Sequence, residues 1–219
     1  MGIQANLDFV KEQLPKHVTL VAVSKTKPIS DVEMAYQCGQ RVFGENKVQE
    51  LCEKHEVLPK DISWHMIGHL QKNKVKYIAP FVDLIHSLDQ ESLAVEINKR
   101  AKQNDRIINC LLQVHLAQES TKFGFTFDEC TLFLNEKQTL YPHIRIIGLM
   151  AMATFSSDNQ IVEEEFKKMS EYYQLQQNKF PNLEVLSMGM SGDYSLAIKH
   201  NSNMVRIGST IFGQRNYNK

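Results

Sequence analysis

The sequence predicts an α/β protein, a single (β/α)8 TIM barrel that spans residues 1–219. Three observations support this prediction. Short apolar runs recur along the chain, polar or amphipathic segments separate them, and no long linker or change of composition divides the chain. Eight such units match the lower size limit of such barrels, and a doubly wound open sheet is the alternative, because periodicity alone does not separate the two folds.

The apolar runs are the predicted strands. Several place Val, Ile and Leu on consecutive positions, which is typical of parallel strands that are covered on both faces. The runs are residues 18–24, 41–44, 63–68, 83–88, 107–114, 144–152, 184–190 and 203–208.

The segments between these runs predict helices. Ser30-Asp-Val-Glu33 has the pattern of a capping box that begins a helix. Residues 89–100 begin acidic and end basic, as the helix dipole favours. Residues 159–178 form a longer amphipathic stretch. Strands that alternate with helices favour a parallel sheet.

Composition gives no general attraction to nucleic acid or to an anionic membrane. The chain has 25 Lys and Arg residues against 25 Asp and Glu residues, so its formal net charge is zero. We interpret Lys72, Lys74 and Lys76 as a solvated helix face rather than a nucleic-acid site. No segment approaches the apolar length of a membrane span.

Cysteine and histidine spacing predicts neither disulfides nor a metal site. No two cysteines form a CxxC pair, which favours reduced thiols in a cytoplasmic protein, and no signal peptide is expected. His65 and His69 lack the HExxH pattern, so we expect no metal ligands there. The cysteines are Cys38, Cys52, Cys110 and Cys130.

Lys25 is the first candidate functional residue, because it closes the first apolar run. Burial of a lysine amine lowers its pKa, and the neutral amine is a nucleophile that forms Schiff bases. The alternative is a lysine with a buried stem and a solvated head. Lys27 shares the strand parity of Lys25, so both could point the same way. Lys27 precedes Pro28 and is expected to lie nearer solvent.

Two polar segments predict a phosphate site. Ser191-Gly192-Asp193 and Gly208-Ser209 follow the last two predicted strands, where barrels commonly bind phosphate, although both could be ordinary turns. Arg206 lies within the last apolar run and needs an acceptor, either Asp193 or the ring nitrogen of a heteroaromatic ligand. Lysine, arginine and phosphate site together suit pyridoxal phosphate, and a Schiff-base aldolase for a phosphosugar is the alternative.

Several blocks of sequence, in order along nearly the whole chain, carry a family resemblance. The chain resembles the YggS/PROSC family of pyridoxal-phosphate homeostasis proteins. Lys47, His69 and His115 depart from residues common in that family, which affects detail at the pocket rim. The blocks are residues 22–28 (AVSKTKP), 43–50 (FGENKVQE), 64–74 (WHMIGHLQKNK), 86–89 (HSLD), 148–152 (GLMAM), 187–191 (SMGMS) and 206–213 (RIGSTIFG).

The resemblance implies a fold-type III pyridoxal-phosphate barrel, like the N-terminal domain of alanine racemase. It implies that Lys25 forms the Schiff base with pyridoxal 5'-phosphate and that Arg206 faces the pyridine nitrogen. It also assigns the rest of the pocket. Ser191, with the backbone of Gly208 and Ser209, would hold the phosphate, Asn46 would line the pocket, and Met188 and Met190 would form an apolar wall.

The resemblance also implies a role. The protein would bind, store and deliver pyridoxal phosphate in intracellular vitamin B6 homeostasis, and indirectly in amino-acid homeostasis, with pyridoxal-phosphate-dependent apoenzymes as recipients. An arginine at the pyridine nitrogen makes the ring a poor electron sink, so we expect no strong catalysis.

The end of the chain bears on the same expectation. Because it comes at Lys219, we expect no second domain and a monomer. The alternative is a racemase-like enzyme that uses an imidazole as its acid. The candidate imidazoles are His65, His86 and His115.

Overall fold

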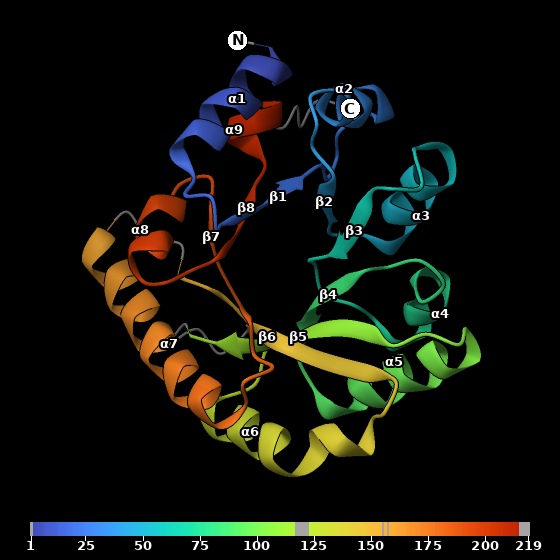
Figure 1. The fold of residues 1–219 in the computed structure, drawn as a ribbon, viewed down its shortest axis with the longest axis vertical. Coiled ribbons are helices and arrows are strands. Elements are labelled where there is room, and N and C mark those ends of the chain that lie inside the picture. Colours follow the sequence, from blue (N-terminus) through green and yellow to red (C-terminus); the bar gives the residue numbers. More distant parts are fainter. Residues whose placement is uncertain (1, 117–122, 155, 157, 215–219) are drawn as a thin grey trace.

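The computed structural model describes residues 2–116, 123–154, 156 and 158–214. Within them, parallel strands close into a barrel in the order β1 to β8, with β8 pairing back to β1. Figure 1 shows the helices arranged around the outside of this barrel. The predicted barrel is therefore confirmed, and the open-sheet alternative is wrong.

Each strand lies within or nearly within a predicted apolar run. Each strand ends where a polar loop begins. The loops lie at the surface, where water can bind their backbone N–H and C=O groups. The strands are β1 (Thr19–Val23), β2 (Val42–Glu45), β3 (Ser63–Met66), β4 (Leu84–Leu88), β5 (Ile108–His115), β6 (Ile144–Met152), β7 (Val185–Met190) and β8 (Met204–Ile207).

Helices follow the strands and cover the outer face of the sheet. They are α1 (Ile3–Gln13), α2 (Ile29–Gln37), α3 (Val48–Val57), α4 (Val75–Ile78), α5 (Glu91–Gln103), α6 (Phe127–Leu132), α7 (Asn159–Lys179), α8 (Tyr194–Lys199) and α9 (Ser209–Phe212), with short turns η1 (Lys72–Lys74), η2 (Phe133–Lys137) and η3 (Gln138–Leu140). Among these described helices, none is long and apolar enough to cross a membrane.

The capping box predicted at Ser30 is wrong. Helix α2 begins at Ile29, directly after Pro28, whose extended backbone (φ −65°, ψ 158°) serves as the N-cap without a side-chain bond. The ring of Pro28 fixes its φ at a value that suits the start of a helix. The helix therefore begins one residue later, and Ser30 lies in its first turn rather than at the N-cap. A capping box does form at α6, where Thr126 and Glu129 exchange backbone and side-chain bonds.

Two apolar layers hold the barrel together. The larger layer packs the outer face of the strands against the helices, and it includes Trp64, Phe43 and Phe166. A smaller layer fills the barrel interior and consists of Val21, Leu84, Leu111, Met150 and Met204. The interior apolar layer leaves the carboxyl ends of the strands to polar side chains, and these ends carry the site in barrels of this kind.

The lysine run lies on the surface, and two of the four cysteines are buried. Lys72, Lys74 and Lys76 are exposed on η1 and α4. All four cysteines are free, and Cys110 and Cys130 are buried. Helix α1 lies beside α9 (Figure 1), where the Asn6 amide donates to the Ile211 carbonyl at 3.0 Å.

Candidate functional site

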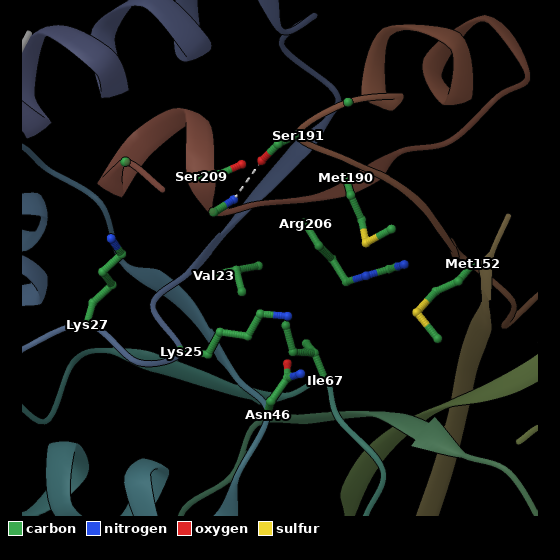
Figure 2. A pocket seen from close by; sticks show the side chains of 13 residues that line it. Val23, Lys25, Lys27, Asn46, Ile67, Met152, Met190, Ser191, Arg206 and Ser209 are labelled. Atoms are coloured by element: carbon green, nitrogen blue, oxygen red, sulfur yellow. Dashed lines mark hydrogen bonds between the residues drawn. The ribbon is translucent and has the colours of Figure 1, made fainter. Parts of the chain in front are cut away.

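A cavity of about 390 Å³ opens at the carboxyl ends of the strands. In Figure 2, Lys25 and Asn46 point into this space from one side, Ser191 and Ser209 lie on the opposite side, and Arg206 lies between them. The cavity is lined by Val23, Lys25, Lys27, Asn46, Ile67, Met152, Met190, Ser191, Gly192, Arg206, Gly208, Ser209 and Gly213.

Lys25 lies in a tight turn directly after β1. The strand ends at Val23, and the amide of Lys27 donates to the carbonyl of Ser24 at 3.0 Å, which closes the turn. Thr26 adopts φ +63°, in the left-handed region, so the chain changes direction here. The Lys25 side chain is half-buried, and its amine points into the cavity (Figure 2).

A buried ion-pair cluster holds this turn from the side of α3. The Lys54 amine donates to the Glu45 carboxylate at 2.7 Å, to the Glu50 carboxylate at 2.8 Å and to the Ser24 carbonyl at 2.7 Å. Glu50 also accepts the amide of Thr26 at 2.6 Å. The backbone on both sides of the candidate lysine is therefore fixed by one cluster of charges.

Glu45 is the most deeply buried member of this cluster. Its carboxylate accepts the Ser24 hydroxyl at 2.6 Å in addition to the Lys54 amine. Burial is the largest influence and raises the pKa of Glu45, while Lys54 and Ser24 act in the opposite direction. A buried carboxylate needs such donors, which explains why Lys54 is only 3% exposed.

The amine of Lys27 binds backbone carbonyls at the end of α9. Its amine donates to the carbonyl of Phe212 at 2.7 Å and to the carbonyl of Gln214 at 3.2 Å, at the end of α9. Both lysines line the cavity, but their amines point in different directions (Figure 2), because the strand ends at Val23 and strand parity does not extend through the turn. Both lysines are half-buried, and Lys25 is the one that points to the centre of the cavity (Figure 2).

Arg206 crosses the inner wall of the cavity from β8 and is 4% exposed. Its Nη1 donates to the carbonyl of Ser187 at 3.0 Å and to the Ser187 hydroxyl at 2.6 Å, and its Nη2 donates to the carbonyl of Ala151 at 3.0 Å. Burial lowers the pKa of Arg206 to about 10, and the charge of Asp193 opposes this shift. Arg206 therefore stays cationic at neutral pH.

The ion pair with Asp193, one of the two possible partners named for Arg206, does not form. The Asp193 carboxylate instead accepts the backbone amide of Met190 at 2.5 Å, which closes the turn after β7. Within the part of the chain that the structure describes, no carboxylate lies within ion-pair distance of Arg206.

The edge opposite Lys25 carries hydroxyl and amide groups. The Ser191 hydroxyl accepts the N–H of Gly208 at 3.2 Å, which ties the loop after β7 to the loop after β8. Ser209 lies next to them (Figure 2). Nothing lies within 4 Å of the position that a Cβ would take at Gly192, so the backbone there is open to the cavity. Hydroxyl and amide donors of this kind bind phosphate.

Asn46 follows β2 and is held by a close backbone contact. A Cβ at Gly68 would lie 2.4 Å from the carbonyl oxygen of Asn46, a distance that no side chain tolerates. Only glycine therefore fits at position 68, and the loop after β3 packs directly against the backbone of Asn46.

The structure does not bring Met188 into the cavity. Met188 is buried in the layer between strands and helices, whereas Met190 and Met152 supply the apolar wall. Gly189 adopts φ +90°, and the pairing of β7 with β8 is irregular between Ser187 and Met190. This irregularity breaks the alternation of side chains, so Met188 and Met190 face different spaces.

The histidines considered as acids do not line the cavity among the described residues. His65 and His86 are buried inside the barrel with their rings joined by a 3.0 Å contact. Burial lowers the pKa of His65 to about 3, and burial, His65 and Arg206 lower that of His86. Both imidazoles are therefore neutral at neutral pH. Over the described ranges, no group of three or more His, Cys, Asp or Glu side chains could hold a metal ion.

Sequence reasoning missed the residues that support the site. Glu45 had a readable signal, because a carboxylate at the end of an apolar run must find a cation. Nothing in the sequence identified Lys54 as that cation. Ile67 and Met152 lie at strand ends, so their position at the cavity follows from the barrel.

The fold and the site place the chain in the class of alanine-racemase-like barrels. The family model for the N-terminal domain of alanine racemase matches residues 2–216. The alanine racemase of Clostridium difficile has the same fold, with a TM-score of 0.78 and 14% identity over 99% of this chain and 58% of that enzyme.

Closer relatives define the family within this class. The pyridoxal phosphate homeostasis protein of Haemophilus influenzae is 38% identical, over 99% of this chain and 98% of that protein. PipY of Synechococcus elongatus, in a structure with pyridoxal phosphate bound, superposes with a TM-score of 0.87 and 32% identity, over 96% of this chain and 100% of PipY. The chain belongs to the family of pyridoxal phosphate homeostasis proteins, which confirms the resemblance read from the sequence.

Proposed function

We propose that this protein binds pyridoxal 5'-phosphate reversibly and acts in intracellular pyridoxal-phosphate (vitamin B6) homeostasis, and indirectly in amino-acid homeostasis. The observation that carries the proposal is the single cavity shared by Lys25, Arg206 and Ser191. The name of the Haemophilus influenzae relative and the pyridoxal phosphate bound to PipY support it.

The donor set fits the polar groups of this cofactor. An aldehyde reacts with an amine, a phosphate accepts from hydroxyl and amide groups, and a pyridine nitrogen accepts from a cation. Lys25 supplies the amine and Arg206 the cation. The phosphate side is supplied by Ser191 with Gly208 and Ser209. A cavity of about 390 Å³ lies in the range of small-ligand sites.

The remaining lining residues confine the ring. Asn46 enters the cavity from the same side as Lys25, and Met190 and Met152 provide an apolar wall on the side of Arg206 (Figure 2). Met188 has no place in this arrangement, because it packs in the layer between strands and helices.

Lys25 supplies the covalent bond. Its neutral amine adds to the aldehyde carbon, a C=N bond forms, and the aldehyde oxygen leaves as water with both amine hydrogens. No oxidant or reductant is needed, and addition of water reverses the step. A single lysine therefore both holds and releases the cofactor, which suits storage and delivery.

The surroundings disfavour strong catalysis. Bound pyridoxal phosphate stabilises carbanions best when its ring nitrogen is protonated. Arg206 is cationic and can only donate, so it keeps a nitrogen that it faces unprotonated. Among the described lining residues, the ionisable side chains are Lys25, Lys27 and Arg206, so no carboxylate or imidazole is placed to move a substrate proton.

The absorption spectrum of the purified protein with added pyridoxal phosphate tests the proposal. Wild type should show a visible Schiff-base band that survives dialysis, Lys25→Ala should lose it, and Lys27→Ala should keep it. A band that persists in Lys25→Ala would move the assignment to Lys27. The absence of a band from all three proteins would overturn the proposal and favour the phosphosugar alternative.

A second measurement separates a carrier from a racemase-like enzyme. The loaded protein is incubated with L-alanine, and the D-enantiomer is quantified by chiral chromatography. We expect no more D-alanine than free pyridoxal phosphate produces. Turnover that exceeds this background and disappears in Lys25→Ala would establish the racemase-like alternative.

We also propose that the protein is one pyridoxal-phosphate-binding domain over residues 1–219, monomeric and cytoplasmic, and that pyridoxal-phosphate-dependent apoenzymes receive the cofactor. The free thiols support a reducing compartment.

Light scattering tests the oligomeric state and should give the mass of one chain, about 25.2 kDa. Mixing the loaded protein with an apo-aminotransferase should restore its activity faster than dissociation into solution allows.

A further inference from the structure

A chain of polar side chains crosses the barrel interior behind the cavity. The Ser63 hydroxyl lies 3.3 Å from Nε2 of His65, and Nδ1 of His65 lies 3.0 Å from Nε2 of His86. Nδ1 of His86 lies 3.3 Å from the Ser187 hydroxyl, which accepts Nη1 of Arg206 at 2.6 Å. The chain therefore connects β3, β4, β7 and β8, and it ends at the arginine of the pocket.

The donors and acceptors available to each group fix the direction of these hydrogen bonds. A guanidinium has donors only, so Arg206 must donate to the Ser187 hydroxyl. Ser187 is fully buried, and among the described residues its hydroxyl has no acceptor other than Nδ1 of His86. If His86 donated instead, the Ser187 proton would be left buried without an acceptor, which is costly. Ser187 therefore donates to Nδ1 of His86.

The same argument determines which nitrogen of each imidazole carries the proton. A neutral imidazole that accepts at Nδ1 carries its proton on Nε2. His86 then donates through Nε2 to Nδ1 of His65, and His65 donates through Nε2 to the Ser63 hydroxyl. Burial lowers the pKa of both imidazoles, which keeps them neutral. Every bond in the series then has its donor on the side of Arg206 and its acceptor on the side of Ser63, so each group turns its acceptor atom toward the guanidinium.

This direction matters because Arg206 is buried without an ion-pair partner among the described residues. A buried charge needs compensating groups. The carbonyls of Ser187 and Ala151 are two of them. Aligned groups that each turn an acceptor atom, the negative end of a dipole, toward the guanidinium are a further source of stabilisation, since chained hydrogen bonds polarise one another.

We propose that Ser63, His65, His86 and Ser187 form a directional hydrogen-bonded chain, with both imidazoles in the Nε2–H tautomer, that positions the Arg206 guanidinium at the cavity. His65 and His86 are positioning residues, because they act through Arg206. The consequence for pyridoxal phosphate rests on the proposed function, whereas the chain itself is a property of the ligand-free protein.

The tautomers can be read directly in the ligand-free wild-type protein. Long-range ¹H–¹⁵N correlation spectra at neutral pH distinguish Nδ1–H, Nε2–H and charged imidazoles. We expect neutral Nε2–H forms for both His65 and His86. An Nδ1–H form or a charged imidazole at either residue would overturn the direction of the chain. This measurement needs no variant, so it does not depend on how a substitution affects folding.

The positioning of Arg206 is tested by breaking the chain in its middle. His86→Phe removes both bonds and keeps a ring, His86→Asn keeps an acceptor near Ser187, and His17→Gln changes an exposed histidine as a control. The readout is the side-chain ¹H–¹⁵N signal of Arg206 in ligand-free protein, assigned with Arg206→Lys. We expect loss or a clear shift of this signal in His86→Phe, a smaller shift in His86→Asn and no change in His17→Gln. An unchanged Arg206 signal in folded His86→Phe would overturn the proposal.

Cofactor binding then links the chain to the proposed function. In His86→Phe the dissociation constant of pyridoxal phosphate should rise roughly tenfold, and the visible band should shift, because Arg206 no longer faces the ring in a fixed orientation. If wild type fails to bind the cofactor, the proposed function is wrong. The tautomers and the Arg206 signal of the ligand-free protein still test whether the hydrogen-bonded series exists and positions Arg206. If wild type binds and His86→Phe binds with the same constant and the same band, the positioning role fails alone.

Discussion

Lys54 donates a hydrogen bond of 2.7 Å to the backbone carbonyl of Ser24, the residue directly before Lys25. The same amine neutralises the buried Glu45 carboxylate at 2.7 Å. One cation thus stabilises a buried charge and fixes the turn that carries Lys25. Stability and the geometry of the site depend on the same side chain.

Replacing Lys54 should therefore weaken both. Lys54→Met leaves the Glu45 carboxylate buried without its cation, and we expect the free energy of unfolding to fall by about 3–5 kcal/mol. Urea denaturation at neutral pH measures this change. Formation of the visible band with pyridoxal phosphate should also be slower, because the turn around Lys25 loses one of its anchors.

Two variants make this result specific. Lys47→Met removes an exposed lysine from the same region and should change stability by less than about 0.5 kcal/mol. The double variant Glu45→Gln/Lys54→Met removes both charges and should recover part of the loss. A loss below about 1 kcal/mol in Lys54→Met would contradict the prediction.

The sequence was sufficient to predict the barrel and to select several of the residues that line its cavity. The predicted run 144–152 coincides with β6, and the residues that follow the strands, Lys25, Asn46 and Ser191, meet in one cavity. Both outcomes follow from local rules. Apolar runs become buried strands, and the carboxyl ends of parallel strands converge in a closed barrel.

Other features depend on backbone detail or on distant contacts that no local pattern records. Gly189 changes the direction of β7, so the placement of Met188 could not be read from alternation. Pro28 displaced the start of α2 from Ser30. The contact between Glu45 and Lys54 joins a strand to the following helix, and it is decided by how that helix packs.

Acid should destabilise the protein through its buried histidines. An unfolded histidine takes up a proton below about pH 6.5, whereas burial lowers the pKa of folded His65 to about 3. Between these values the unfolded state binds more protons, so stability rises with pH and is lost on acidification. From about pH 7 to about pH 5, we expect His65 alone to account for a loss of about 2 kcal/mol.

Urea denaturation at several pH values checks this prediction. The stability of His65→Gln should depend less steeply on pH than that of wild type, since the variant has one buried imidazole fewer to protonate on unfolding. His17→Gln, which changes an exposed histidine, should follow the wild-type curve. Equal slopes for His65→Gln and wild type would contradict the assignment.

Lys27 should control retention of the cofactor rather than its covalent attachment. Its amine binds the carbonyls of Phe212 and Gln214 and so anchors α9, which carries Ser209 at the edge of the cavity that we propose binds the phosphate. Lys27→Met should keep the visible band and release pyridoxal phosphate about tenfold faster. Release is measured by trapping the cofactor with an excess of apoenzyme. Lys16→Met, at an exposed position before β1, is the control and should release at the wild-type rate.

Ser191 should distinguish the phosphorylated cofactor from its unphosphorylated form. Its hydroxyl lies on the edge of the cavity opposite Lys25 and accepts the N–H of Gly208 at 3.2 Å, so a phosphate there gains one further donor. Ser191→Ala should raise the dissociation constant of pyridoxal phosphate about ten- to a hundredfold, because a hydrogen bond to a charged group contributes about 1.5–3 kcal/mol. Pyridoxal, which has no phosphate, should bind wild type and the variant equally. Equal losses for both ligands would mean that Ser191 acts only by tying the two loops together, and Ser195→Ala, at an exposed position of α8, should change neither constant.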